Sequence, residues 1–331
     1  MHAPDGFLNA GTAVTTGAVS VGAVGVALRQ TRERLADKQV PLAGITAAFI
    51  FAAQMFNFPV AAGTTGHLLG GAMAAILLGP AMGALVVTVV VVVQALAFAD
   101  GGLTALGYNV LNMAVVTSFG GYAVFRLLRR VLPDNATGVI VGTALAGALS
   151  VVLAATAFSI EWLFGATAPI PFDTVFGSMV GVHLLIGIGE GLLSGLAVGA
   201  VLAARPDLVY GARDLSRVQL LDRPRVGMRG FVIGGVLAAL LFAVVVSQFA
   251  APDPDGLERV AADTGFAESG QDHALGGGIF ADYATAGIGN ETLSLAVAGV
   301  VGVVITLAVG TGLFMAVRDR RRDPVHERAP V

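Results

Sequence analysis

The sequence of 331 residues contains no cysteine, only one lysine and few charged side chains of either sign. Without cysteine, the chain forms no disulfide and offers no thiolate to a metal. Charged residues make up only 12% of the chain, against roughly a quarter in soluble domains, so water is not its main solvent. The lysine, Lys38, follows Asp37, which excludes a Gly-Lys-Ser/Thr phosphate loop. Any ATPase that drives this protein is therefore a separate subunit.

The N-terminus lacks the basic region with which a secretory signal peptide begins. The first apolar stretch is also not followed by a small-residue cleavage site. We therefore expect no cleaved signal peptide. His2 is a large residue of the kind that leaves the initiator methionine in place, so we expect Met1 to be the chain terminus.

Apolar residues, by contrast, make up 56% of the chain. They come in runs of about 18 to 25 residues, the length of helix that crosses a hydrocarbon core of roughly 30 Å. The sequence therefore predicts an all-α, polytopic transmembrane helical bundle. The Gly79-Pro80 pair favours a short third span separate from the fourth, because proline interrupts a helix. The alternatives are a third segment that is tilted, partly re-entrant or continuous with the fourth. The nine predicted spans lie at about 9–28, 41–57, 67–79, 81–99, 107–128, 138–160, 174–204, 229–250 and 292–317.

Basic residues orient these spans, because Lys and Arg are enriched in cytoplasmic loops. With the N-terminus outside and the C-terminus cytoplasmic, 18 of the 19 basic residues lie inside and only Arg259 lies outside. The opposite orientation would reverse this asymmetry. The inside residues are Arg29, Arg32, Arg34, Lys38, Arg126, Arg129, Arg130, Arg205, Arg213, Arg217, Arg223, Arg225, Arg229, Arg318, Arg320, Arg321, Arg322 and Arg328.

A polar linker at 205–228 divides the chain into two modules. The first, 1–204, has seven predicted spans. The second, 229–317, is a two-span hairpin around an acidic outside segment at 251–291, which we expect to be loosely structured. A basic cytoplasmic tail follows at 318–331. The hairpin has little core of its own, so we expect it to dock on the first module.

Two histidines, His2 and His67, fall at the outside surface of the predicted bundle. The Met1 amine, the His2 amide nitrogen and the His2 imidazole Nδ1 can bind one ion through a five-membered and a six-membered chelate ring. One more imidazole completes a square-planar N₄ site, the geometry typical of Ni(II) or Cu(II). His67, in a glycine-containing loop, is the natural fourth ligand. The ordinary alternative is a frayed terminus and a solvated loop histidine.

Several polar residues near these ligands have two interpretations. They could orient the ligands through hydrogen bonds behind the metal. The amides could equally join helices to one another, and the acid, which opens a Gly-Gly loop, could simply form a turn. The candidates are Asn57, Gln94, Asp100, Asn109 and Asn112.

His183 and Glu190 share one face of the seventh span. Ionisable groups inside a span are costly and usually face the bundle interior. They could serve metal transit, but a buried helix–helix hydrogen-bonded pair is the interpretation we favour. The acidic segment and His273 could pre-concentrate cations, although a solvated acidic loop is the more frequent explanation. Its acids are Asp253, Asp255, Glu258, Asp263 and Asp272.

These motifs resemble the membrane substrate-capture subunit of nickel/cobalt energy-coupling-factor transporters over about residues 1–204. The later Pro-Asp-Gly-Leu-Glu stretch resembles the small partner subunit whose domain is named for that pentapeptide, so the two are fused here. Position 3 is Ala where the family often has Ile, which leaves the chelate unaffected. The matching stretches are Met1–Leu8, Gly63–Gly71, Asp100–Gly107, Asn109–Met113, His183–Glu190 and Pro254–Glu258.

The resemblance implies a multi-pass protein of a prokaryotic cell membrane that is not an enzyme and needs no organic cofactor. It implies that Met1, His2 and His67 bind the transported metal outside. A transmembrane coupling subunit and two ABC ATPase subunits would then drive its release inside. The Gln54–Pro59 stretch is more similar to nickel members, and square-planar N₄ coordination favours low-spin Ni²⁺, whereas Co²⁺ for cobalamin synthesis stays open.

The alternative hypothesis is a stand-alone secondary metal transporter or channel. It would use His183 and Glu190 as a relay near the middle of the membrane. No nucleophile–base pair and no nucleic-acid-binding pattern is present in the sequence.

Overall fold

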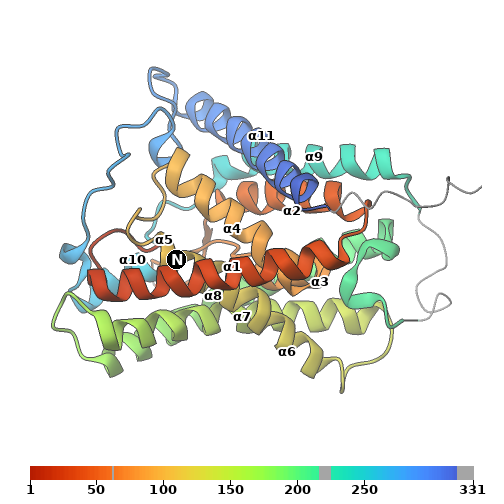
Figure 1. The fold of residues 1–331 in the computed structure, drawn as a ribbon. Coiled ribbons are helices and arrows are strands. Elements are labelled where there is room, and N and C mark those ends of the chain that lie inside the picture. The colour runs from red at the N-terminus through yellow and green to blue at the C-terminus, as the bar shows by residue number, and fades with distance from the viewer. Residues whose placement is uncertain (62, 216–224, 319–331) are drawn as a thin grey trace, which may run out of the picture.

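The computed structural model describes residues 1–61, 63–215 and 225–318. It is a bundle of long helices that run roughly along one another (Figure 1). Within the described residues, seven helical segments are long and apolar enough to cross a membrane. They are α1 (Ala10–Arg34), α4 (Pro80–Ala97), the continuous α5, η1 and α6 (Leu106–Asn109, Val110–Gly120 and Gly121–Leu128), α7 (Ala136–Gly165), α8 (Phe172–Ala204), α9 with η4 (Met228–Val244 and Val246–Phe249) and α11 (Glu291–Val317).

Two of the nine predicted spans are not among these seven. The second is α2 (Gln39–Gln54), an apolar helix of 16 residues. The third, predicted at 67–79, is only α3 (Gly71–Leu78), eight residues long. At 1.5 Å per residue, α3 is about 12 Å long, too short to cross a membrane alone. The prediction at 67–79 was wrong about length because α3 is apolar from burial inside the bundle, with every residue buried.

The chain enters α3 through an irregular segment whose second half, residues 64–70, is buried inside the bundle. Residues after α2 form a small antiparallel hairpin, β1 (Phe58–Pro59) and β2 (Thr65–Gly66). Gly70 then takes a left-handed φ of 77° before α3 begins. Non-helical backbone at such depth is tolerated only where protein buries it and satisfies its polar groups. Here Glu190 of α8 accepts hydrogen bonds from the Leu69 and Gly70 amides, at 2.6 and 2.9 Å.

Gly79 separates α3 from α4, as the sequence predicted. It has a φ of 96°, and Pro80 starts α4. The two helices pack against each other from this bend, where Gly83 lies so close to the Ala75 backbone that a Cβ would be 2.6 Å from its nitrogen. The 67–99 region is therefore one short buried arm followed by one long span.

The C-terminal hairpin docks on the first module, as expected, with α9 and α11 both packed on α2 (Figure 1). Small residues permit close contact: Gly302 of α11 lies over the Phe51 ring. The segment between the two helices is more ordered than we predicted. It contains α10 (Gly256–Thr264) and two 3₁₀ turns, η5 (Ala267–Ser269) and η6 (Ala281–Tyr283), and makes backbone hydrogen bonds to the first module.

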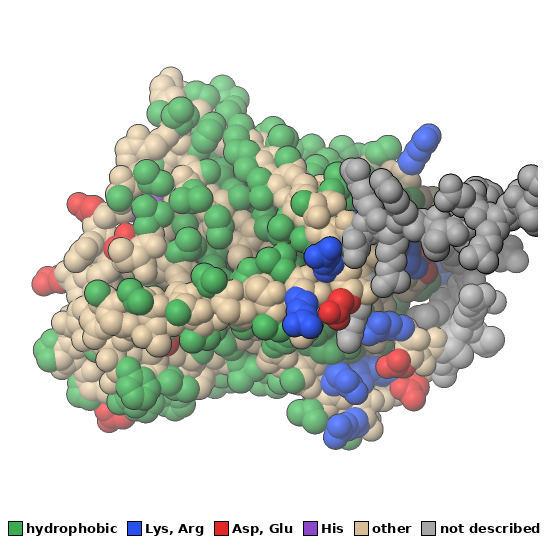
Figure 2. Space-filling model, viewed as in Figure 1, with side chains coloured by type: hydrophobic (Ala, Val, Ile, Leu, Met, Phe, Trp, Pro, Cys, Tyr) green, Lys and Arg blue, Asp and Glu red, His purple; other side chains and the backbone are tan. Residues whose placement is uncertain are grey.

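Charge is divided between the two ends of the bundle. In Figure 2 the Lys and Arg side chains gather, together with some acids, at the end where α1 finishes, whereas the other end shows Asp and Glu but no Lys or Arg in this view. Two further 3₁₀ turns at the basic end, η2 (Pro206–Leu208) and η3 (Tyr210–Ala212), begin the linker. This asymmetry is what the orientation prediction requires, and the orientation itself stays a prediction. Several predicted inside residues lie outside the described residues: Arg217, Arg223, Arg320, Arg321, Arg322, His326 and Arg328.

Candidate metal centre

The N-terminal segment runs into the protein, and its end lies among α5, α8 and α10 (Figure 1). Met1 and Ala3 are only 5% and 1% exposed. Asn109 of α5 donates to the Ala3 carbonyl and accepts from the Ala3 amide, both at 3.0 Å. Such a reciprocal pair fixes the backbone beside His2. Asn109, one of the residues predicted to support the ligands, therefore holds the terminus rather than a histidine ring.

Asp5 fastens the same segment to the loop before α5. Its carboxylate accepts hydrogen bonds from the Leu103, Thr104 and Ala105 amides and from the Thr104 hydroxyl. Gly102 is required at this contact, because a Cβ there would lie 2.2 Å from the Asp5 nitrogen. Asp5 was not among the residues predicted to form or support the site. It was present only in the N-terminal motif.

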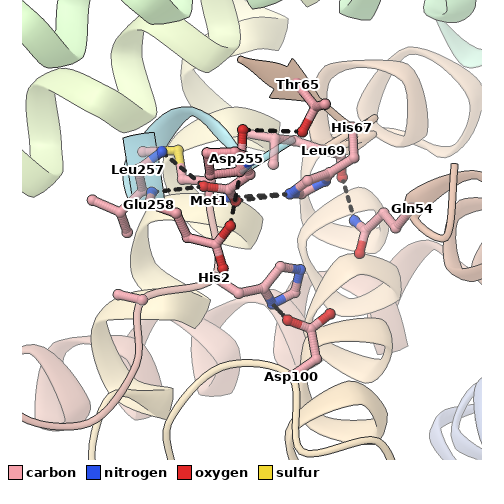
Figure 3. A network of polar contacts seen from close by, with 12 residues as sticks. Met1, His2, Gln54, Thr65, His67, Leu69, Asp100, Asp255, Leu257 and Glu258 are labelled. Atoms are coloured by element: carbon pink, nitrogen blue, oxygen red, sulfur yellow. Dashed lines mark hydrogen bonds and ion pairs between the residues drawn. The ribbon is translucent and has the colours of Figure 1, made fainter. Parts of the chain in front are cut away.

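The Met1 amine meets His67 at the centre of this arrangement (Figure 3). Its nitrogen lies 2.9 Å from His67 Nε2. It also forms an ion pair with the Asp255 carboxylate. The His67 Nδ1 is 3.3 Å from the Leu68 carbonyl. A proton on Nδ1 would leave a lone pair on Nε2, which is the atom that faces the amine.

His2 occupies the neighbouring position with no hydrogen-bond partner for either ring nitrogen. Its side chain is 7% exposed, and its ring centroid lies 5.4 Å from that of His67. Burial lowers the pKa of His2 to about 4, so the imidazole is neutral at ordinary pH. A buried polar side chain normally finds a partner, and a neutral imidazole without one is available as a ligand.

The His2 ring is turned so that Nδ1 lies on the side of Asp100, 3.6 Å from its carboxylate (Figure 3). Asp100 also accepts a hydrogen bond of 2.6 Å from the Tyr283 hydroxyl, and Gln94 donates to that hydroxyl at 3.0 Å. Asp100 therefore faces His2 directly. Gln94 supports Asp100 through the Tyr283 hydroxyl and through its own backbone carbonyl, which accepts from the Asp100 amide at 3.2 Å.

The other two predicted supporting residues, Asn112 and Asn57, have different surroundings. Asn112 donates to Glu161 of α7 at 2.8 Å, a contact between helices. Asn57 lines a cavity of about 490 Å³ that His2, His67 and Asp100 also line. The backbone carbonyl of Asn57 accepts from Ala251 of the hairpin segment.

His183 and Glu190 are not hydrogen-bonded to each other. Glu190 holds the backbone after His67, as described above. His183 Nδ1 faces the Met179 carbonyl at 2.8 Å. His183 also lines a cavity of about 10 Å³ beneath Met1, His67 and Asp255, room for about one water molecule.

Asp255 is the principal residue that sequence reasoning placed elsewhere, in a solvated acidic loop. It is the N-cap of α10, where Oδ1 accepts from the Leu257 and Glu258 amides at 2.8 and 2.9 Å. Burial alone would raise the pKa of the Asp255 carboxyl, but the Met1 ammonium and His67 hold that pKa well below its usual range. Two sequence signals existed: the Asp-x-x-Glu pattern of a capping box and the pentapeptide itself.

The nitrogens of Met1, His2 and His67 do not form a conventional metal site built from side chains alone. Among the described residues, no group of three or more His, Cys, Asp or Glu side chains could hold a metal ion. A metal centre here needs backbone nitrogen donors, which the buried Met1 amine and the His2 amide can supply.

Comparisons with known proteins agree with this architecture. Residues 2–208 match the family model described as the cobalt uptake substrate-specific transmembrane region, and residues 229–319 match the PDGLE domain. A putative fused nickel transport protein NikMN of Archaeoglobus fulgidus is 36% identical over 95% of this chain and 98% of that relative. The fused nickel transport protein NikMN of Rhodobacter capsulatus is 31% identical over 97% and 99%.

A solved structure is similar as well. The crystal structure of a truncated transition metal transporter has 33% sequence identity and a TM-score of 0.54, covering 61% of this chain and 98% of that one. The fold is thus that of a multi-pass membrane protein with a buried N-terminus. The chain belongs to the family of cobalt uptake substrate-specific transmembrane proteins and carries a PDGLE domain in the same polypeptide. Its named relatives are transport proteins rather than enzymes.

Proposed function

We propose that this protein is the substrate-specific membrane component of a nickel uptake transporter that captures Ni²⁺ at its own N-terminus. The observation that carries the proposal is the Met1 amine, 2.9 Å from His67 Nε2, beside a neutral His2 without a hydrogen-bond partner. The relatives named as nickel and cobalt transport proteins support the substrate class.

The metal would be held by four nitrogens. The Met1 amine, the His2 amide nitrogen and His2 Nδ1 form two fused chelate rings, and His67 Nε2 closes the plane. In the present arrangement His2 Nδ1 lies on the Asp100 side. A half-turn about the Cβ–Cγ bond exchanges Nδ1 with Cδ2, so that Nδ1 leaves Asp100 and joins the chelate.

Nickel fits this donor set better than the alternatives. Mg²⁺ and Ca²⁺ require oxygen ligands, whereas planar nitrogen coordination is typical of Ni(II) and Cu(II). Cobalt remains the second candidate, because a cobalt transport protein CbiM of Geobacter sulfurreducens is 31% identical over 80% of this chain and 79% of that relative.

Transport would require partners. The chain has no phosphate-binding loop, so a transmembrane coupling subunit and two ABC ATPase subunits would supply the energy. The stand-alone relay through His183 and Glu190 gains no support, because both Glu190 oxygens accept from backbone amides. Uptake by the purified chain in liposomes without any ATPase would revive it.

The test is stoichiometric Ni²⁺ binding by purified protein with a native N-terminus and a C-terminal tag. We expect one yellow, diamagnetic Ni²⁺ per chain, lost in His2→Ala and in His67→Ala. The matched control is His273→Ala, since His273 lines the same cavity as His2 and His67 but is not one of the proposed ligands, and its Nδ1 accepts a hydrogen bond from the Leu275 amide. One alanine placed before Met1 should also abolish the complex, because it separates the amine from His2. Unchanged binding by the extended chain would refute the proposal.

A further inference from the structure

Asp255 uses its two carboxylate oxygens for two different purposes. Oδ1 caps α10 through the Leu257 and Glu258 amides. Oδ2 forms the ion pair with the Met1 amine and lies 3.7 Å from His67 Nε2 (Figure 3). Because the cap fixes one oxygen, the direction of the other is fixed too, and it points at two of the nitrogens proposed to bind the metal.

The turn that carries Asp255 is joined to the loop that carries His67. Thr65 donates its amide to the Pro254 carbonyl at 2.9 Å and its hydroxyl to the Asp253 carbonyl at 3.0 Å. On the other side, Gly256 packs so closely on α8 that a Cβ would lie 2.5 Å from Ile186 Cδ1. Asp255 is thus held between α8 and the His67 loop, independently of the amine.

We propose that Asp255 is the resident counter-ion of the metal centre: it pairs with the Met1 ammonium before metal arrives and neutralises the metal complex afterwards. This inference rests on the proposed function. It means that the negative charge beside the Met1 amine comes from the PDGLE domain, through Asp255.

The charge balance explains why one carboxylate serves both states. Without metal, the ammonium carries +1 and Asp255 carries −1, so the buried pair is neutral. On binding Ni²⁺, the ammonium and the His2 amide each release one proton to water, and two nitrogen–metal bonds form in their place. The complex of Ni²⁺ with one amide anion carries +1, which Asp255 again cancels. A buried charge without a partner is costly. Without the Asp255 carboxylate, both the metal-free ammonium and the Ni²⁺ complex would carry an unpaired buried charge.

The substitution that isolates the charge is Asp255→Asn. Asparagine is as good an N-cap as aspartate, so α10 keeps its start while the negative charge disappears. The matched control is Asp253→Asn, which removes an exposed carboxylate from the same turn. Thermal unfolding of the three proteins checks that all are folded.

The first measurement needs no metal and uses the near absence of lysine. An amine-selective ester can label only the Met1 amine and Lys38, whose side chain is 48% exposed and serves as the internal reference. In Asp255→Asn the Met1-to-Lys38 labelling ratio, measured by mass spectrometry, should rise at least about tenfold, because the carboxylate no longer holds the amine. Asp253→Asn should match the wild type. An unchanged ratio in Asp255→Asn overturns the inference.

The second measurement is Ni²⁺ affinity by titration calorimetry at fixed pH. Asp255→Asn should bind at least about tenfold more weakly, equal to about 1.4 kcal/mol, because its complex keeps an uncancelled positive charge. Equal affinity in a folded variant overturns the counter-ion role. If the wild type itself binds no Ni²⁺, the proposed function fails, and that failure is distinct because the labelling ratio is measured without metal.

Discussion

Glu190 provides the sharpest test of how the His67 loop is held in place. Its side chain is fully buried and accepts hydrogen bonds from two backbone amides just after His67. The change Glu190→Ala leaves both amides without a partner. A buried donor left unsatisfied costs roughly 1–3 kcal/mol, so the free energy of unfolding should fall by about 2–6 kcal/mol for the pair. The loop should also lose its position, and Ni²⁺ binding should weaken.

Two measurements separate these effects: thermal unfolding in detergent and Ni²⁺ titration of the folded protein. The matched control is Glu161→Ala, another buried carboxyl, whose partner is the Asn112 side chain on a neighbouring helix rather than the His67 loop. We expect both variants to unfold at lower temperature. Only Glu190→Ala should bind Ni²⁺ more weakly while still folded.

Either of two results would contradict the proposed role of Glu190. If Glu190→Ala unfolds at the wild-type temperature, the two backbone hydrogen bonds contribute nothing. If it is destabilised but binds Ni²⁺ as tightly as Glu161→Ala, Glu190 does not position the metal centre. Normal binding with lost transport would instead favour the relay hypothesis.

Three further predictions follow from the fold. Asp5→Ala should free the N-terminal segment and lower Ni²⁺ affinity without preventing folding, seen as faster proteolysis near the N-terminus; an unaffected affinity would separate that anchor from the site. Gly256→Ala should push α10 off Ile186 and so weaken both stability and Ni²⁺ binding, whereas wild-type values would show that α8 can give way. Because the chain has no cysteine, Asp263→Cys should react with an impermeant maleimide in intact cells and Lys38→Cys only after permeabilisation; the reverse pattern would invert the orientation.

The long spans were predictable because a membrane requires long apolar helices. The basic side chains gather at one end of the bundle, which is what the orientation prediction requires. What failed was α3, predicted as a span at 67–79. Its residues are as apolar as those of a span, because the interior of the bundle excludes water just as lipid does. Length and composition cannot distinguish these two apolar surroundings. The partner that makes the buried loop possible, Glu190, lies more than a hundred residues away in the sequence.

Part of the candidate metal centre could be predicted from the sequence, for a different reason. The chemistry of Met1, His2 and His67 is local: a free amine, the adjacent imidazole and one loop histidine. The structure brings the amine and His67 together, and their role as ligands stays a prediction. The position of Asp255 could not be derived, since no local pattern says that an N-cap on a distant hairpin reaches the first residue. Asn112 shows the opposite kind of error. It was predicted to support the ligands, but its side chain bonds to Glu161 of another helix.

The contacts between the C-terminal hairpin and the first module suggest why the two are joined in one chain. Three parts of the segment between α9 and α11 contact the first module at the metal centre: Asp255 at the amine, Gln271 at the Asp5 carbonyl, and Tyr283 at Asp100. Joining two binding partners in one chain makes their contact intramolecular and raises its effective concentration. The fusion therefore places Asp255, the proposed counter-ion, and the Met1 amine with which it forms an ion pair in one polypeptide.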